Sequence, residues 1–244
     1  MTRQRPSVAV RTVTTVRRLV NRAGFDVVRD PTRQFAAALQ RHGVDTVIDI
    51  GANVGQFGQS LRRTGFTGRI HSVEPLQAAY DQLGARARAD ASWTAERAAL
   101  SNAPGVVTMN VSGNSVSSSV LPMLGTHAEA APRSRYVATE DVPATTVDEL
   151  IARLGIDPQT TLLKIDVQGY EKSVLDGATA TLPRFVGVRT ELSLTPLYDG
   201  QALLADIVRY LEDAGLELWY VEPGFRDPVT RRLLQLDGTF FRRA

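Results

Sequence analysis

The chain has 244 residues, and 43% of them are hydrophobic, which is enough for a buried core and excludes a globally disordered protein. Cysteine is absent from the sequence, which excludes disulfides, cysteine-based zinc sites and a cysteine nucleophile. The formal charge of +2 and the pI near 9.1 give only a mild indication of an anionic partner.

The first 30 residues are rich in arginine, and their first acidic residue is Asp26. Valines recur at helical spacing from Val10 to Val20, which predicts a basic amphipathic helix. We expect residues 8–23 either to pack on the following domain, 31–244, to dock on an anionic membrane surface, or to form a homodimer contact. No apolar run is long enough to cross a bilayer and no secretory signal is evident, so the expected location is cytoplasmic. If residues 8–23 dock on a membrane, the expected contact is peripheral, at the inner face.

Helical and extended patterns alternate from residue 31 onward. Short buried runs rich in β-branched residues predict strands, and the polar–apolar segments between them predict helices. In the first half, helices are expected at 31–41, 54–63 and 76–88, and strands at 46–50, 69–73, 93–100 and 106–111.

Residues 112–145 have no clear periodicity and contain a serine cluster with several prolines and glycines. Such a long stretch predicts either a lid over a binding site, at 112–143, or a plain insertion. Beyond it, strands are expected at 162–167, 185–192, 216–221 and 234–241, and helices at 171–182 and 202–214. The alternation predicts an α/β fold with a Rossmann-like, doubly wound, mostly parallel sheet that ends in an antiparallel hairpin strand.

A glycine-rich turn follows the first predicted strand, in the sequence VIDIGANVGQF at 47–57. Gly51 allows a tight turn, Gly55 allows close packing of helix on strand, and the helix N-terminus offers amides to an anion. Asp49, just before the first glycine, can hold an ammonium group directly or through water. An acid and an anion site side by side suit the zwitterionic aminoacyl end of S-adenosylmethionine.

The second strand ends in HSVEP at 71–75, which places Glu74 a little over 20 residues after the glycines. An acid at that position binds ribose hydroxyls in dinucleotide sites as well, so Glu74 does not distinguish a methyl donor from NAD. Asn53 does distinguish them. In the dinucleotide motif G-x-G-x-x-G, the second glycine lets a pyrophosphate approach the backbone, and here Asn53 replaces that glycine, which disfavours NAD.

The sequence resembles the FkbM family of methyltransferases over roughly residues 44–242. The matching stretches are VIDIGANVGQFG, HSVEP, AALSN at 98–102, TTVDEL at 145–150, LLKIDVQGYEKSVLDGA at 162–178 and ELSLTPLYDG at 191–200. The resemblance implies a class I methyltransferase that uses S-adenosylmethionine to methylate a hydroxyl of a sugar, glycolipid or secondary metabolite. The expected cofactor-binding residues are Asp49, Gly51, Ala52, Asn53, Gly55, Glu74, Pro75, Ser101 and Asp166.

An alcohol is a poor nucleophile until it loses its proton, so methylation requires either a base or a metal ion near the hydroxyl. Asp166 and Glu191 stand near the ends of two predicted strands and are expected at the same crevice. Asp166 could act as base or position the donor, or it could be a structural acid paired with Lys164, and Glu191 is the second choice. His127, in the long loop, is a third possible base. No spacing indicates a dedicated metal site, although Mg²⁺ could be held by the two acids and substrate oxygens.

Three other functions remain open on the sequence alone. An NAD-dependent oxidoreductase would share the fold and Glu74. A nucleic-acid methyltransferase would fit the pI, but the Asn/Asp-Pro-Pro-Tyr signature is missing after Ile165. A cofactor-binding scaffold without catalysis would keep the same motifs.

Overall fold

The computed structural model describes residues 31–243. The predicted amphipathic helix at 8–23 lies outside the described residues. Within them, no helix is both long and apolar enough to span a membrane.

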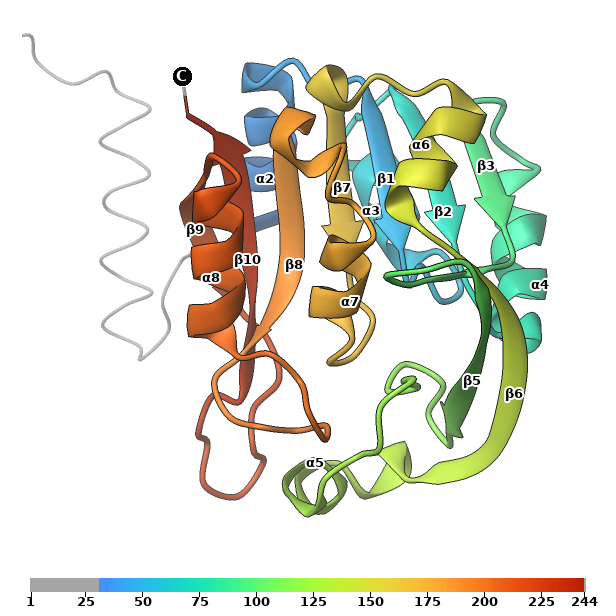
Figure 1. The fold of residues 1–244 in the computed structure, drawn as a ribbon, viewed down its shortest axis with the longest axis vertical. Coiled ribbons are helices and arrows are strands. Elements are labelled where there is room, and N and C mark those ends of the chain that lie inside the picture. Colours follow the sequence, from blue (N-terminus) through green and yellow to red (C-terminus); the bar gives the residue numbers. More distant parts are fainter. Residues whose placement is uncertain (1–30, 244) are drawn as a thin grey trace, which may run out of the picture.

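A seven-stranded sheet forms the centre of the fold, with the strand order β3-β2-β1-β7-β8-β10-β9 (Figure 1). The first five strands are parallel, whereas β10 is antiparallel to both of its neighbours. The predicted fold class is therefore confirmed, including the terminal antiparallel hairpin. The strands are β1 (Thr46–Ile50), β2 (Arg69–Val73), β3 (Trp93–Glu96), β7 (Thr161–Ile165), β8 (Gly187–Ser193), β9 (Leu216–Pro223) and β10 (Gln235–Arg242).

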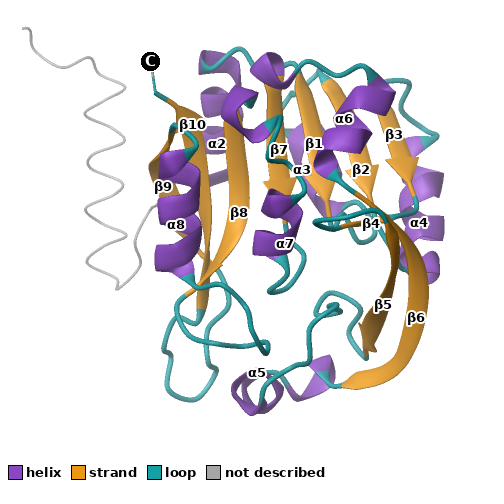
Figure 2. Cartoon of the chain, viewed as in Figure 1, coloured by secondary structure: helices purple, strands orange, loops and turns teal. Residues whose placement is uncertain are grey.

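Helices cover both faces of this sheet, as the layers in Figure 2 show. One face packs against α6, α7 and α8 through a cluster that includes Ile165, Val174 and Leu211. The other packs against α2, α3 and α4 through Phe35, Leu61 and neighbouring side chains. The helices are α2 (Pro31–Arg41), α3 (Gln56–Arg63), α4 (Gln77–Ala87), α5 (Gly125–Ala130), α6 (Val147–Leu154), α7 (Glu171–Asp176) and α8 (Leu204–Asp213).

A second, three-stranded sheet extends beyond the carboxyl ends of the parallel strands (Figure 1). It consists of β4 (Ala99–Leu100), β5 (Gly105–Ser112) and β6 (Tyr136–Thr145). This sheet corrects two expectations. The strand predicted at 93–100 is divided between the two sheets, and the predicted loop at 112–145 contains β6 and α5. The helix predicted at 171–182 is also shorter, since α7 ends at Asp176 and Gly177 caps it.

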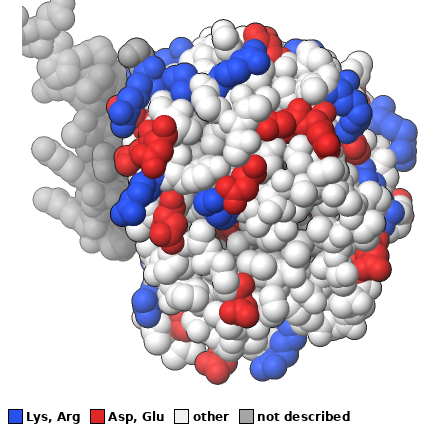
Figure 3. Space-filling model, in the orientation of Figure 1, with Lys and Arg blue, Asp and Glu red and all other residues white. Residues whose placement is uncertain are grey.

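Figure 3 shows basic and acidic side chains interspersed over the helices that cover one face of the sheet. The lower part of this view, where α5 and its flanking loops lie, is largely uncharged. This face of the described residues therefore lacks the continuous basic patch that would bind the phosphates of a nucleic acid.

Candidate active site

A cavity of about 270 Å³ lies at the carboxyl ends of β1, β2 and β7. Residues after each of these strands line it, namely Gly51–Asn53, Glu74–Leu76 and Asp166–Gln168. Ligands of open α/β sheets bind at this edge, because the loops that follow parallel strands converge there. The remaining wall is mainly apolar and includes Phe57, Leu100, Met109, Val116, Val120 and Tyr170.

The turn after β1 is fixed by contacts within the protein. Gly51 has a φ of 72°, and a Cβ atom at this position would lie 1.8 Å from the backbone oxygen of Asp166. The glycine is therefore needed because the β1 turn and the end of β7 touch, rather than to leave space for a ligand. Gly55 does not line the cavity, and its Cβ would meet Leu83 and Trp93, as expected for close helix packing.

The amides of this turn are already used. The N–H groups of Gly51 and Ala52 donate to the oxygen of Val73, and the N–H of Gly55 donates to Ala52. The N–H of Asn53 donates to the Glu74 carboxylate. These turn amides are therefore not free to bind a ligand carboxylate, and the expected anion site is left to the first turn of α3, where Gln56 and Phe57 line the cavity.

Glu74 lies at the floor of the cavity in a fixed orientation. One carboxylate oxygen accepts from the Asn53 amide at 2.8 Å, and the other accepts from the Leu76 amide at 2.9 Å. Burial raises the pKa of Glu74 to about 7, against the opposing effect of these two hydrogen bonds. Each oxygen keeps a second lone pair, so the carboxylate can accept from two neighbouring hydroxyl groups.

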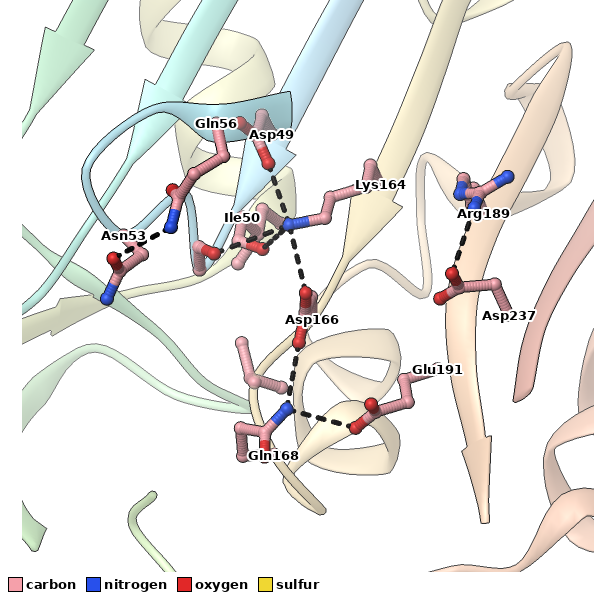
Figure 4. Close-up of polar contacts among 12 residues, drawn as sticks. Asp49, Ile50, Asn53, Gln56, Lys164, Asp166, Gln168, Arg189, Glu191 and Asp237 are labelled. Carbon is pink, nitrogen blue, oxygen red and sulfur yellow. Dashed lines mark hydrogen bonds and ion pairs between the residues drawn. The ribbon is translucent and has the colours of Figure 1, made fainter. Parts of the chain in front are cut away.

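Asp49 does not reach the cavity, which corrects the expectation that it contacts a ligand directly. Its side chain is 0% exposed and lies 2.9 Å from the ammonium of Lys164. Burial alone would lower the pKa of Lys164, but the Asp49 and Asp166 carboxylates outweigh it and raise that pKa. Lys164 also lies 3.5 Å from Asp166, whose side chain is 42% exposed and lines the cavity (Figure 4). Asp166 is thus the accessible acid of this group.

Glu191 lies behind Asp166 rather than in the cavity wall. The amide of Gln168 stands between the two acids and donates to both, as Figure 4 shows. Burial and the neighbouring Asp166 raise the pKa of Glu191 well above its ordinary value. Residues 31–243 contain no group of three or more His, Cys, Asp or Glu side chains arranged to hold a metal.

Two further predicted residues lie away from the cavity. The Ser101 hydroxyl is buried and hydrogen-bonds the Tyr170 hydroxyl at 2.9 Å, so it supports a residue of the wall. His127 is buried between the rings of Tyr198 and Phe225, and burial lowers its pKa to about 4. His127 does not line the cavity, so the expectation that it could act as the base is wrong for this structure.

The cavity also contains charged residues that sequence reasoning did not select. Arg189 and Asp237 line it beyond Lys164, and their side chains form an ion pair at 2.9 Å. Arg189 also pairs with Glu222 and lies over the ring of Phe35. Arg189 could have been predicted from the sequence, because strand alternation places it on the same face as Glu191. Asp237 could not be found in this way, because the register of β10 against β8 brings it there.

Residues 113–121, which we call the strap, cross the cavity from the end of β5. Ser115, Val116, Ser118 and Val120 line the cavity, so this segment is the part of the stretch 112–143 that borders it, and its role as a lid stays a prediction. The strap is held at both sides. The side-chain amide of Asn53 donates to the Ser115 hydroxyl at 3.4 Å, and the Ser119 hydroxyl donates to the backbone oxygen of Gln168 at 2.7 Å.

We expect amide hydrogen exchange in the strap to slow when S-adenosylhomocysteine is added, because a ligand in the cavity would contact its inner side. The measurement is exchange mass spectrometry with and without that compound. Residues 136–145 of β6 provide the internal control, since they are paired along β5 in any case. Equal protection of the strap in both samples would mean that it does not respond to the ligand.

Comparison with known proteins agrees with the resemblance seen in the sequence. The model of the methyltransferase FkbM domain matches residues 49–218. The 31-O-demethyl-FK506 methyltransferase FkbM of Streptomyces tacrolimicus is 29% identical over 208 residues, which cover 72% of this chain and 75% of the relative.

Solved structures similar to this chain include two methyltransferases. Magnesium protoporphyrin IX methyltransferase from Synechocystis, with bound S-adenosylmethionine, has a TM-score of 0.47 at 11% identity, and the match covers 100% of this chain and 87% of that one. An rRNA methylase from Streptococcus thermophilus has a TM-score of 0.49 at 8% identity, with 89% and 99% covered.

The glycine turn and the acid after β2 both lie within the matched segment. The family match therefore removes the oxidoreductase interpretation, which shared the fold and the acid after β2. The chain belongs to the FkbM family of methyltransferases and uses S-adenosylmethionine as its methyl donor.

Proposed function

We propose that this enzyme methylates a hydroxyl oxygen of a sugar, glycolipid or secondary metabolite. The observation that carries the proposal is the position of Asp166, an accessible carboxylate in the wall of the cavity. The name of the Streptomyces tacrolimicus relative supports an oxygen acceptor, because it specifies a 31-O-demethyl substrate.

The residues of the cavity fit S-adenosylmethionine. Glu74 would accept hydrogen bonds from the two ribose hydroxyls, since each of its fixed oxygens has a free lone pair. The apolar wall around Leu100 and Met109 would take the adenine ring. Asp166, on the far side of the β1 turn, would lie toward the aminoacyl and sulfonium end.

When bound, S-adenosylmethionine supplies a methyl group that bonds to the acceptor oxygen as the carbon–sulfur bond breaks and its electron pair stays on sulfur. Asp166 would accept the proton of the hydroxyl, which makes the oxygen a better nucleophile. The ammonium of Lys164 lies 3.5 Å from this carboxylate, on the side away from Gln168. The strap would exclude water from the same space.

The direct test is incubation of the full chain with S-adenosylmethionine and a panel of methyl glycosides and macrolide alcohols, each paired with the corresponding amino compound. Mass spectrometry would identify the methylated atom. Methylation of hydroxyls and not of amines is expected. Methylation of the amines alone would contradict oxygen transfer without contradicting methyltransferase activity.

Asp166→Asn should reduce turnover about 100-fold or more, because it removes the base but keeps the size of the side chain. Calorimetry should show binding of S-adenosylhomocysteine within a few-fold of wild type. Full turnover in the variant would exclude Asp166 as the base. A large loss of binding would instead assign it to the positioning of the donor.

Donor affinity should depend on pH through Glu74. The ribose hydroxyls donate to the ionised carboxylate, so binding favours the charged form of a group whose pKa is about 7. Affinity for S-adenosylhomocysteine should therefore increase from pH 6 toward pH 8 and level off above the pKa, with at most about a tenfold change per pH unit below it.

Glu74→Gln is the matched variant, since an amide cannot ionise. It should weaken binding by about 1–3 kcal/mol at pH 8 and remove most of the pH dependence. Burial also raises the pKa of Glu171 to about 7, so any slope that remains in the variant reports that second group. An unchanged slope would show that Glu74 does not contact the donor.

A further inference from the structure

Gln168 has an unusual backbone conformation for a residue of its type. Its φ is 55°, in the left-handed region that glycine adopts freely and other residues adopt at a cost. Of the four non-glycine residues with positive φ in the described chain, Asn53, Ser115 and Gln168 line the cavity. A side chain kept at such a position indicates a use for that side chain.

The amide of Gln168 is held from several directions. Its nitrogen donates to Asp166 Oδ1 at 3.1 Å and to Glu191 Oε2 at 3.1 Å. Its oxygen accepts from the Tyr198 hydroxyl at 2.8 Å. The orientation of the amide follows from these partners, because two carboxylates need a donor and a tyrosine hydroxyl supplies one.

The elements around Gln168 fix it in place. Tyr198 is fully buried, and its ring lies so close to Gly169 that a Cβ atom there would be 2.8 Å away. Glu191 is held from the other side by Gln235, which donates to the same oxygen at 2.6 Å. The strap reaches the backbone oxygen of Gln168 through Ser119. The side-chain amide is therefore a rigid support.

Asp166 has two competing partners in the described structure. Lys164 approaches Oδ2 at 3.5 Å, and Gln168 holds Oδ1 at 3.1 Å. A carboxylate free of Gln168 would gain by turning toward the ammonium, because ion pairs strengthen at shorter distance in a partly buried site. Such a turn would direct its lone pairs away from the cavity and toward Lys164.

We propose that Gln168 is a positioning residue, which keeps the Asp166 carboxylate directed into the cavity and away from a closer ion pair with Lys164. The inference rests on the role proposed above for Asp166. It adds that Glu191 of β8 and Tyr198 both act on this carboxylate through one side-chain amide, while the strap holds the backbone of the same residue.

Crystal structures of the full chain with S-adenosylhomocysteine test the geometry without an acceptor. In Gln168→Met, which keeps the length of the side chain but not its hydrogen bonds, Asp166 should turn toward Lys164 and shorten the distance to Nζ. Gln168→Gly serves as a second variant that removes the backbone strain as well. An Asp166 carboxylate that keeps its wild-type orientation in both variants would overturn the proposal.

A kinetic cycle tests the consequence, using the alcohol of the panel with the highest turnover. Gln168→Met should lower kcat about 10- to 100-fold, with a smaller change in the KM for donor, because a misplaced reacting group affects the chemical step. In an Asp166→Asn background the same change should lower kcat by less than about threefold, since Gln168 would then have no base to position.

The controls separate this proposal from the function on which it rests. Gln159→Met, an exposed glutamine at the opposite end of the sheet, should leave kcat unchanged. Tyr198→Phe removes one support of the amide and should give a smaller loss of the same kind. If Gln168→Met lowers kcat equally with and without Asp166, the positioning role of Gln168 is refuted but the role of Asp166 as base is not. Full turnover in Asp166→Asn would refute both roles.

Discussion

Replacing Gly51 with alanine should destabilise the protein by several kcal/mol and abolish binding of S-adenosylhomocysteine. The left-handed conformation costs an alanine about 1–2 kcal/mol. The new Cβ would also lie 1.8 Å from the backbone oxygen of Asp166, and the two residues directly follow the paired strands β1 and β7, which limit the movement of either backbone. Relief of the contact must therefore separate the β1 turn from the end of β7, two of the segments that line the cavity.

Gly43→Ala provides the matched control for this experiment. Gly43 has a φ of 66°, but no atom lies within 4 Å of the position of a Cβ there. This variant should show only the conformational cost and should bind S-adenosylhomocysteine normally. Urea unfolding and calorimetry of both variants give the comparison. Similar losses in the two would mean that the close approach of Asp166 has no energetic consequence.

Lys164→Met should lower the free energy of unfolding by about 3–5 kcal/mol, the typical loss when one partner of a buried ion pair is removed. The reason is Asp49, which is fully buried and has the Lys164 ammonium at 2.9 Å. Without that cation, the folded protein would contain an uncompensated buried charge. Asp166 should matter less to stability because solvent reaches it.

A second substitution distinguishes this explanation from a simple packing defect. Asp49→Asn in the Lys164→Met background removes the uncompensated charge of the buried carboxylate, so the double variant should be more stable than Lys164→Met alone. Urea unfolding at neutral pH measures both. If Asp49→Asn destabilises the Lys164→Met protein further, the loss does not come from the unpaired carboxylate.

The elements that the sequence predicted most accurately are short strands in the centre of the sheet. The range 46–50 of β1 was predicted to the residue, because five consecutive buried side chains are bounded by a polar segment and a glycine turn. In contrast, β6 was missed. Most of its side chains are not buried, and it contains Pro143, a residue that disfavours strands, so neither a hydrophobic alternation nor a strand composition marks it.

The candidate site likewise contains residues that the local sequence identifies and others that depend on the folded structure. Gly51, Glu74 and Asp166 could be found because each directly follows a strand, and the ends of parallel strands share one edge. The pairing of Asp49 with Lys164 depends on the register between β1 and β7. The position of His127 depends on packing against Tyr198 and Phe225, which are distant in sequence, so a loop histidine could not be recognised as a core residue.

The place of β10 between β8 and β9 has a consequence for how the protein is made. During synthesis, β8 and β9 emerge before any residue of the strand that joins them, so the edge of β8 stays bare until residues 235–242 follow. A bare edge strand invites pairing with other nascent chains. Because Asp237 arrives on that same strand, a chain halted before it would lack part of the cavity wall. Binding competence and protection from aggregation would therefore be acquired together, once residues 235–242 have been synthesised.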